Sequence, residues 1–61
     1  MSAQKIMKSV VKQLSTAGLE AVVRYAQGVL IVAAEDASQA KEILGMESYS
    51  GYINEIEIIL V

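Results

Sequence analysis

The run Val-Leu-Ile-Val-Ala-Ala at residues 29–34 constrains the fold of this chain more than any other feature, because its six apolar residues show no alternation. A strand apolar on both faces is usually covered on both, whereas a half-buried strand alternates apolar and polar residues. The run is also the longest uninterrupted apolar stretch. A membrane-spanning helix needs roughly 18 such residues. We therefore expect a strand at 29–34 and no membrane segment.

Residues 2–17 have the spacing of an amphipathic helix, with apolar side chains gathered on one side. Ser2 is the expected N-cap, and Gly18 stands where a left-handed residue ends a helix. A basic stripe occupies the opposite side of this helix and consists of Lys5, Lys8 and Lys12. The stripe also interrupts the N-terminal apolar residues, so the sequence does not predict a signal peptide.

A β-hairpin is expected after this helix. Leu19–Tyr25 is rich in apolar and β-branched residues, Ala26–Gly28 is a short turn with glycine at a permissive position, and Val29–Ala34 follows. A second helix is expected at Ala37–Leu44, with Asp36 as N-cap and Gly45 as the residue that ends it.

The remaining residues predict a loop and a last strand. Residues 46–51 form the loop, and the strand runs from Tyr52 to Val61. Alternation gives this strand two different faces. One face, expected under the helices, carries Ile56, Ile58 and Leu60, and the other carries Glu55, Glu57, Ile59 and Val61.

The resulting order, α-β-β-α-β, resembles the ferredoxin-like β-α-β-β-α-β plan without its first strand. It implies one small α+β domain over residues 1–61, with two helices on one face of a three-stranded sheet. Metal-carrying domains of that plan place a Cys-x-x-Cys motif after the first strand, and here both are absent. Amino-acid-sensing regulatory domains share the order, so the resemblance identifies a fold plan and no family.

The missing residue types exclude several chemistries. The chain has no Cys and no His, so it lacks thiolate ligands, an imidazole base and a disulfide framework. The formal net charge of −2 argues against nucleic-acid binding. We therefore expect no catalytic residue, no cofactor, no metal ion and no enzymatic activity.

Acidic side chains offer two weak candidates for chemistry. Glu55 and Glu57 would project from one strand face about 7 Å apart, a separation that suits paired carboxylates in acid–base catalysis. Glu35 and Asp36 could hold a hard cation. The favoured interpretations are a solvated face for the two glutamates, paired with Arg24 or Lys41, and a helix cap for Asp36.

The apolar content instead points to a binding surface. Hydrophobic residues make up 54% of this short chain, and two helices on one sheet face leave the other face uncovered. We expect a homo-oligomer, with a dimer favoured. The sequence also allows a second, different protein as a binding partner. The candidate interface residues are Val22, Tyr49, Ile59 and Val61. Tyr52 is expected at the core edge and Tyr25 as a structural residue at the hairpin.

The leading functional hypothesis is a non-enzymatic, cytoplasmic protein-interaction or oligomerisation module. One alternative is a regulatory domain that binds a small molecule at a dimer interface, among Tyr25, the 46–52 loop and the first helix. Another is a small inhibitor of a partner enzyme. The basic stripe is interpreted as a solvated helix face, with docking to an acidic surface as its alternative.

Overall fold

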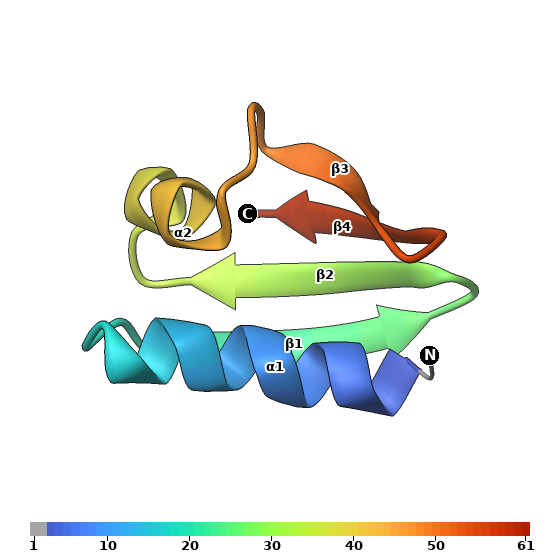
Figure 1. Ribbon diagram of the computed structural model, residues 1–61, viewed down its shortest axis with the longest axis horizontal. Helices are drawn as coiled ribbons and strands as arrows, with labels where there is room; N and C mark the ends of the chain where they lie inside the picture. The colour runs from blue at the N-terminus through green and yellow to red at the C-terminus, as the bar shows by residue number, and fades with distance from the viewer. Residues whose placement is uncertain (1–2) are drawn as a thin grey trace.

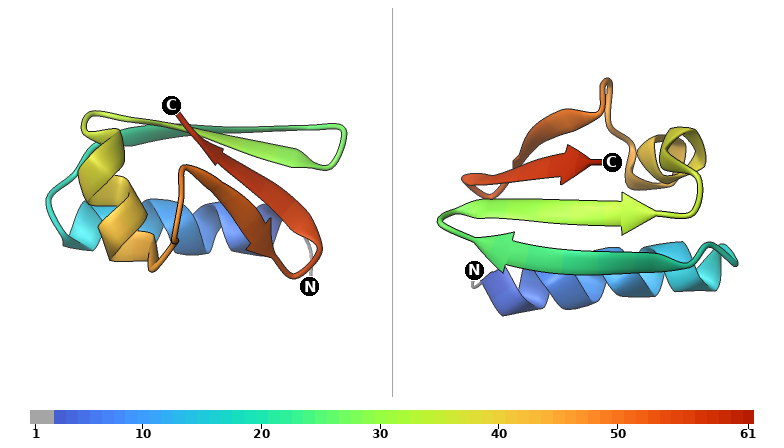
Figure 2. Two further views of the ribbon diagram at one scale, coloured as in Figure 1. Left: turned by 90° about the horizontal axis from the view of Figure 1, so that it is seen from above. Right: turned by 180° about the vertical axis from the view of Figure 1, so that it is seen from behind.

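In the computed structural model, which describes residues 3–61, two helices lie on one face of a four-stranded mixed sheet (Figures 1 and 2). The elements in chain order are α1 (Ala3–Thr16), β1 (Ala21–Ala26), β2 (Val29–Ala34), α2 (Ala37–Leu44), β3 (Ser50–Ile53) and β4 (Ile56–Leu60). The α+β class is therefore confirmed, whereas the predicted strand number is wrong. Ser2, the expected N-cap of α1, lies outside the described residues.

A glycine-terminated cap ends α1 and fixes where β1 begins. Gly18 has a φ of 80° and donates its N–H to the Ser15 carbonyl at 2.9 Å. Leu19 donates its N–H to the Leu14 carbonyl, also at 2.9 Å, and both leucine side chains are buried. This is a Schellman motif with its usual apolar contact. The sequence predicts that this strand starts at Leu19. Because Leu19 belongs to the cap, β1 starts at Ala21 instead.

Both ends of α2 are capped as the sequence predicts. The Asp36 carboxylate accepts a hydrogen bond from the Gln39 backbone N–H at 3.1 Å. At the other end, Gly45 has a φ of 71°, and the Met46 N–H reaches the Lys41 carbonyl at 3.0 Å. These caps hold in place a helix of eight residues, which is too short to be stable by itself.

The sheet has the strand order β1-β2-β4-β3. β1 and β2 form an antiparallel hairpin, β2 and β4 run parallel, and β4 and β3 form a second antiparallel hairpin. The crossover from β2 through α2 makes the parallel pairing possible. β1 and β3 are thus the two edges of the sheet, and β4 lies inside it (Figure 1).

The predicted last strand is in fact a hairpin. Asn54 and Glu55 have φ values of 49° and 70° and reverse the chain between Ile53 and Ile56. Two positive φ angles at the centre of a two-residue loop are the mark of a type I′ turn. The reversal turns part of the predicted loop into β3 and adds the fourth strand. The sequence conceals it because no glycine or proline marks the turn.

Glu55 gives this turn a local weakness that a glycine would remove. A side chain in the left-handed region costs roughly 1 kcal/mol, and glycine adopts the same angles freely. We therefore expect Glu55→Gly to raise the free energy of unfolding by about 0.5–1 kcal/mol, measured by urea denaturation. Glu57→Gly, inside β4, is the matched control and should lower stability. A destabilising Glu55→Gly would contradict the turn.

The core lies between the helices and the inner face of the sheet. It is formed by nine buried apolar residues, namely Ile6, Val10, Leu14, Leu19, Leu30, Val32, Ala40, Ile58 and Leu60. Ile58 and Leu60 were both predicted to lie under the helices, and this is confirmed. Ile56 packs against the same cluster but is only half-buried.

Candidate functional site

The sheet face opposite the helices is covered by neither α1 nor α2 (Figure 2). We call it the open face. The strand registers place on it the residues that alternate along each strand with those facing the core. They are Val22, Arg24, Ala26, Val29, Ile31, Ala33, Ser50, Tyr52, Glu57 and Ile59. Val61 continues this set beyond the end of β4, where its N–H donates to the Val32 carbonyl at 2.9 Å.

Aliphatic side chains occupy the middle of the open face. Ile31 and Ile59 are register partners on the two central strands. Val22, on β1, is 65% exposed, and Val61 is 59% exposed. Three of the four candidate interface residues predicted from the sequence, Val22, Ile59 and Val61, therefore lie on this one face. Large apolar side chains that remain this exposed are what interaction surfaces present to a partner.

Charged residues surround this apolar strip. Arg24 follows Val22 on the open face, and Glu57 lies on β4 beside Ile59. At the start of β1, the Glu35 N–H donates to the Glu20 carbonyl at 2.9 Å, so these two acidic residues are neighbours at one corner of the sheet. The margin of the open face thus carries both signs of charge.

The tyrosines are arranged differently from the prediction. Tyr49 is exposed, but the Lys41 ammonium of α2 stands 5.2 Å from its ring centroid, a cation–π distance that places Tyr49 on the helix side of the sheet. It is therefore separate from Val22, Ile59 and Val61. Tyr52, expected at the core edge, is 73% exposed, and its register with Glu57 places it on the open face, so that prediction is wrong. Tyr25, expected as a structural residue, is exposed near the end of β1.

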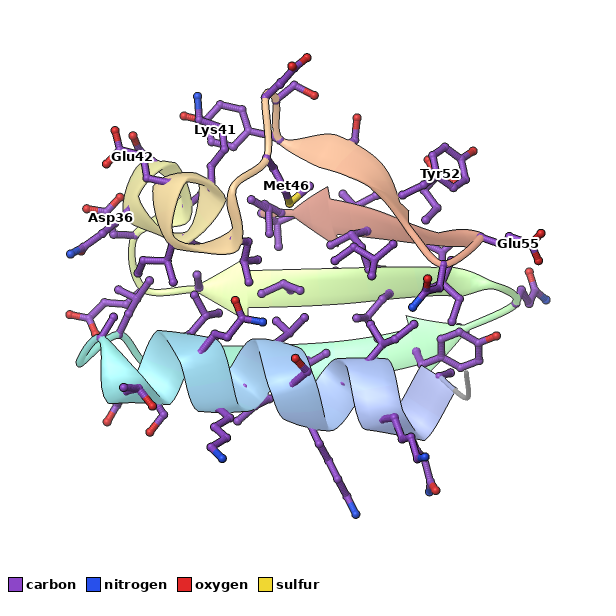
Figure 3. The ribbon with its side chains drawn as sticks, viewed as in Figure 1. Asp36, Lys41, Glu42, Met46, Tyr52 and Glu55 are labelled. Carbon is purple, nitrogen blue, oxygen red and sulfur yellow. The ribbon has the colours of Figure 1, made fainter. Side chains whose placement is uncertain are left out.

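The acidic candidates do not assemble into a chemical site. Glu55 belongs to the β3–β4 turn, so it does not share a strand face with Glu57, and that expectation is wrong (Figure 3). Asp36 caps α2 as described. Among residues 3–61, no group of three acidic side chains is placed to hold a metal ion.

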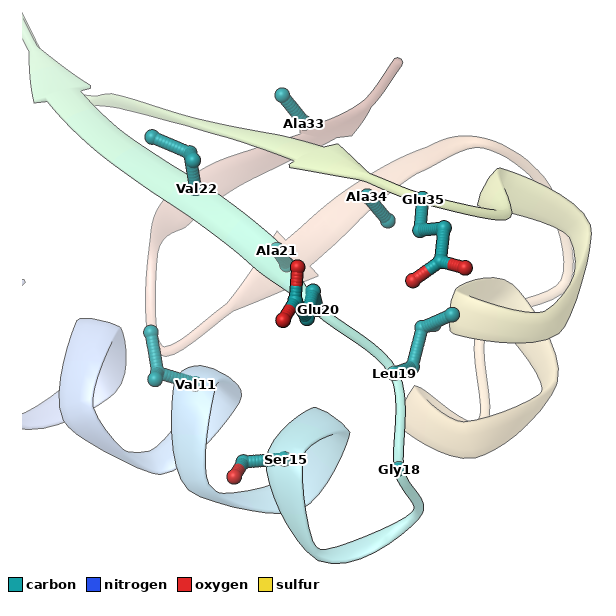
Figure 4. A pocket seen from close by; sticks show the side chains of 10 residues that line it. All are labelled: Val11, Ser15, Gly18, Leu19, Glu20, Ala21, Val22, Ala33, Ala34 and Glu35. Carbon is teal, nitrogen blue, oxygen red and sulfur yellow. The ribbon is translucent and has the colours of Figure 1, made fainter.

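A hollow opens beside the start of β1 (Figure 4). Its volume is about 820 Å³, and it is lined by Val11 and Ser15 of α1, residues 18–22, and residues 33–35 at the end of β2 and just after it. A smaller hollow of about 350 Å³ continues along α1 past Met7, Lys8 and Lys12. The ligand site expected among Tyr25, the 46–52 loop and the first helix is not assembled, because β1 and β3 are opposite edges of the sheet.

Comparison with known proteins gives no relative: no protein-family model, no curated protein and no solved structure matches this chain. Within the described residues, no helix has the length and apolar character needed to cross a membrane.

Tyr52 and Ile31 are large side chains of the open face that the sequence does not assign to it. Tyr52 was misplaced because the turn at Asn54 was not recognised. Ile31 sits in an apolar run without alternation, so its face is fixed only by its register with Arg24 and Ile59. Asn54, inside an otherwise apolar and acidic stretch, was the one available signal for the turn.

Proposed function

We propose that this chain is a small, non-enzymatic protein-interaction module that associates with a second copy of itself through the open face. The observation that carries the proposal is the strip of Val22, Ile31, Ile59 and Val61, which lies on one face of the sheet and is left uncovered by both described helices. We also propose a cytoplasmic location, as expected from the sequence.

An interface with a second copy would use a moderate share of the surface of this chain. A stable interface takes about 800 Å² from each partner. The whole chain exposes 4118 Å², so such an interface would use about one fifth of its surface. Full burial of an aliphatic side chain contributes about 1.5–3 kcal/mol, of which a partly buried side chain gains only the share that is still exposed, and association costs at least about 4 kcal/mol. The four side chains of the strip therefore support a dimer of modest affinity.

The charges at the margin are compatible with self-association. In a two-fold interface, each copy presents the same surface, so a face with a single sign of charge repels itself. The open face has Arg24 on β1 and Glu57 on β4. A two-fold arrangement can therefore set each arginine against an acidic side chain of the other copy.

We expect Ile59→Lys to give a folded monomer. The side chain points away from the core, so the added charge stays in water in the monomer but is buried in the dimer, where it costs several kcal/mol. Light scattering over a dilution series, together with circular dichroism, measures assembly and folding separately. Thr16→Lys, at an exposed position at the end of α1, is the matched control and should still associate.

Two further results bear on the same proposal. Tyr52→Ala should leave the melting temperature of the monomer, measured at a dilution at which the protein does not associate, nearly unchanged, because the side chain packs little within its own chain. A wild-type chain that stays monomeric at every concentration tested, or an Ile59→Lys variant that associates as the wild type does, would remove the open face as a self-association surface.

The strand arrangement also suggests how the fold relates to the ferredoxin-like plan. We infer a rearranged form of that plan, in which β4 occupies the sheet position that the first strand has in the ferredoxin-like order. The inference is supported by the interior position of β4, parallel to β2 and antiparallel to β3. In such a sheet both helices share one face, and the other face is left for contacts with partners.

A further inference from the structure

The free edge of β1 presents main-chain groups in a regular order. The Glu20 carbonyl accepts a hydrogen bond from the Glu35 N–H, so the main chain of Glu20 points toward β2. Because hydrogen bonding alternates along an antiparallel strand, the main-chain groups of Ala21, Val23 and Tyr25 point the other way. Within residues 3–61, β1 has a neighbouring strand on one side only. Its outer side is therefore a template for one more strand.

The side of α1 continues this edge as a groove. Val11 is 41% exposed and lines both hollows, together with Ser15. Figures 1 and 2 show α1 running along β1 at the outer limit of the sheet. We call the edge of β1 together with this side of α1 the β1 groove. A strand added there gains main-chain hydrogen bonds from β1 and apolar contact from Met7 and Val11.

The position of α1 argues against a second copy in the β1 groove. Antiparallel pairing of two β1 strands about a two-fold axis keeps the helices of both copies on the same side of the joined sheet. Since α1 reaches past β1 at this edge, the two α1 helices would compete for one position (Figure 2). Lys8 and Lys12 of the two copies would also face one another. A single extended segment avoids both problems.

The charged side chains along the groove indicate which kind of segment would bind there. Lys8 and Lys12 line the smaller hollow beside Val11, whereas Glu20 and Glu35 line the larger hollow at the start of β1, so the basic part of the groove is the part that follows α1. Acidic side chains on an added strand would meet these two ammonium groups, and basic side chains would be repelled. We propose that the β1 groove binds an extended, acidic and apolar segment of a partner protein, which adds to the sheet as a strand beside β1.

A short synthetic peptide in which Glu and Val alternate at every second position, so that both face α1, with Thr at the positions between them, tests the proposal. The same peptide with Lys in place of Glu is its charge control. Binding is followed by NMR titration of the labelled protein. We expect the acidic peptide to bind at least about tenfold more tightly at low salt, with a preference that decreases as salt is added. The amide signals of Ala21, Val23 and Tyr25 should shift and become protected from exchange.

Two variations separate strand addition from charge attraction. An acidic peptide N-methylated at alternate residues keeps its charge but cannot complete the hydrogen bonds, and it should lose binding. The Lys8→Glu and Lys12→Glu double variant leaves the edge of β1 intact and should prefer the basic peptide. Equal binding of both peptides to the wild type, binding of the methylated peptide, or shifts confined to Ile31 and Ile59 would overturn the proposal.

This inference stands apart from self-association through the open face. Light scattering without peptide measures the dimer, and the peptide titration measures the β1 groove. A monomeric protein that binds the acidic peptide would overturn only the proposed self-association. A dimer that binds neither peptide would overturn only the strand addition.

Discussion

Ile58→Lys is expected to unfold the protein. Ile58 is 0% exposed in the middle of β4, with Leu30 and Gly51 as its register partners on either side. A lysine there would bury an unpaired charge, or its neutral amine without a partner, at a cost of several kcal/mol. Small domains have only about 5–15 kcal/mol of stability in total, and this chain is near the lower limit of domain size. Far-UV circular dichroism and a thermal melt should show loss of the folded state.

The adjacent variant Ile59→Lys is the control, because neighbouring strand residues point to opposite faces. It should keep the folded-state spectrum while it loses association. The opposite pattern, with Ile58→Lys folded and Ile59→Lys unfolded, would mean that the assignment of the two β4 faces is wrong by one residue. The pair therefore tests the register of the sheet independently of any partner.

Leu14→Ala should cause the second-largest loss of stability. Leu14 is 0% exposed, and its carbonyl accepts the Leu19 N–H in the cap of α1. Truncation of a buried leucine costs about 2–5 kcal/mol, depending on how far the surrounding residues close the cavity. Urea denaturation monitored by circular dichroism measures this change.

Val11→Ala on the same helix is the matched control. Its side chain is 41% exposed, so truncation to alanine should lower the free energy of unfolding by less than about 1 kcal/mol. Equal losses for the two variants would contradict the position of Leu14 at the centre of the core and the orientation of α1 on the sheet.

The parts of the fold that were predictable are those whose ends carry a local chemical signal. Gly18 and Gly45 adopt the left-handed angles expected at helix ends, and the Asp36 carboxylate forms the predicted cap. Gln27 and Gly28 form the tight turn of the first hairpin, with φ values of 52° and 80°. At these positions the local sequence is sufficient, because each signal acts on its own neighbours.

The second hairpin was not predictable in the same way. Asn54 is suited to a left-handed turn, but Glu55 is not, and neither residue is the glycine or proline that usually marks a tight turn. The chain reverses there because Ile53 and Ile56 both pack on the core, a reason that only the tertiary structure supplies. The candidate interface changed accordingly, as Tyr52 moved onto the open face and Tyr49 to the helix side.

The interior position of β4 has a consequence for the kinetics of folding. Each hairpin pairs residues close in sequence, so each can form within microseconds. The parallel pairing of β2 with β4, which we call the seam, instead joins partners such as Leu30 and Ile58. These partners are far apart in sequence, because α2 and β3 lie between them along the chain. The entropy cost of closing that loop is incurred before the contact stabilises the chain. Formation of the seam should therefore be the slowest step of folding. Substitutions at the seam should therefore slow refolding, whereas changes in either turn should mainly alter the lifetime of its own hairpin.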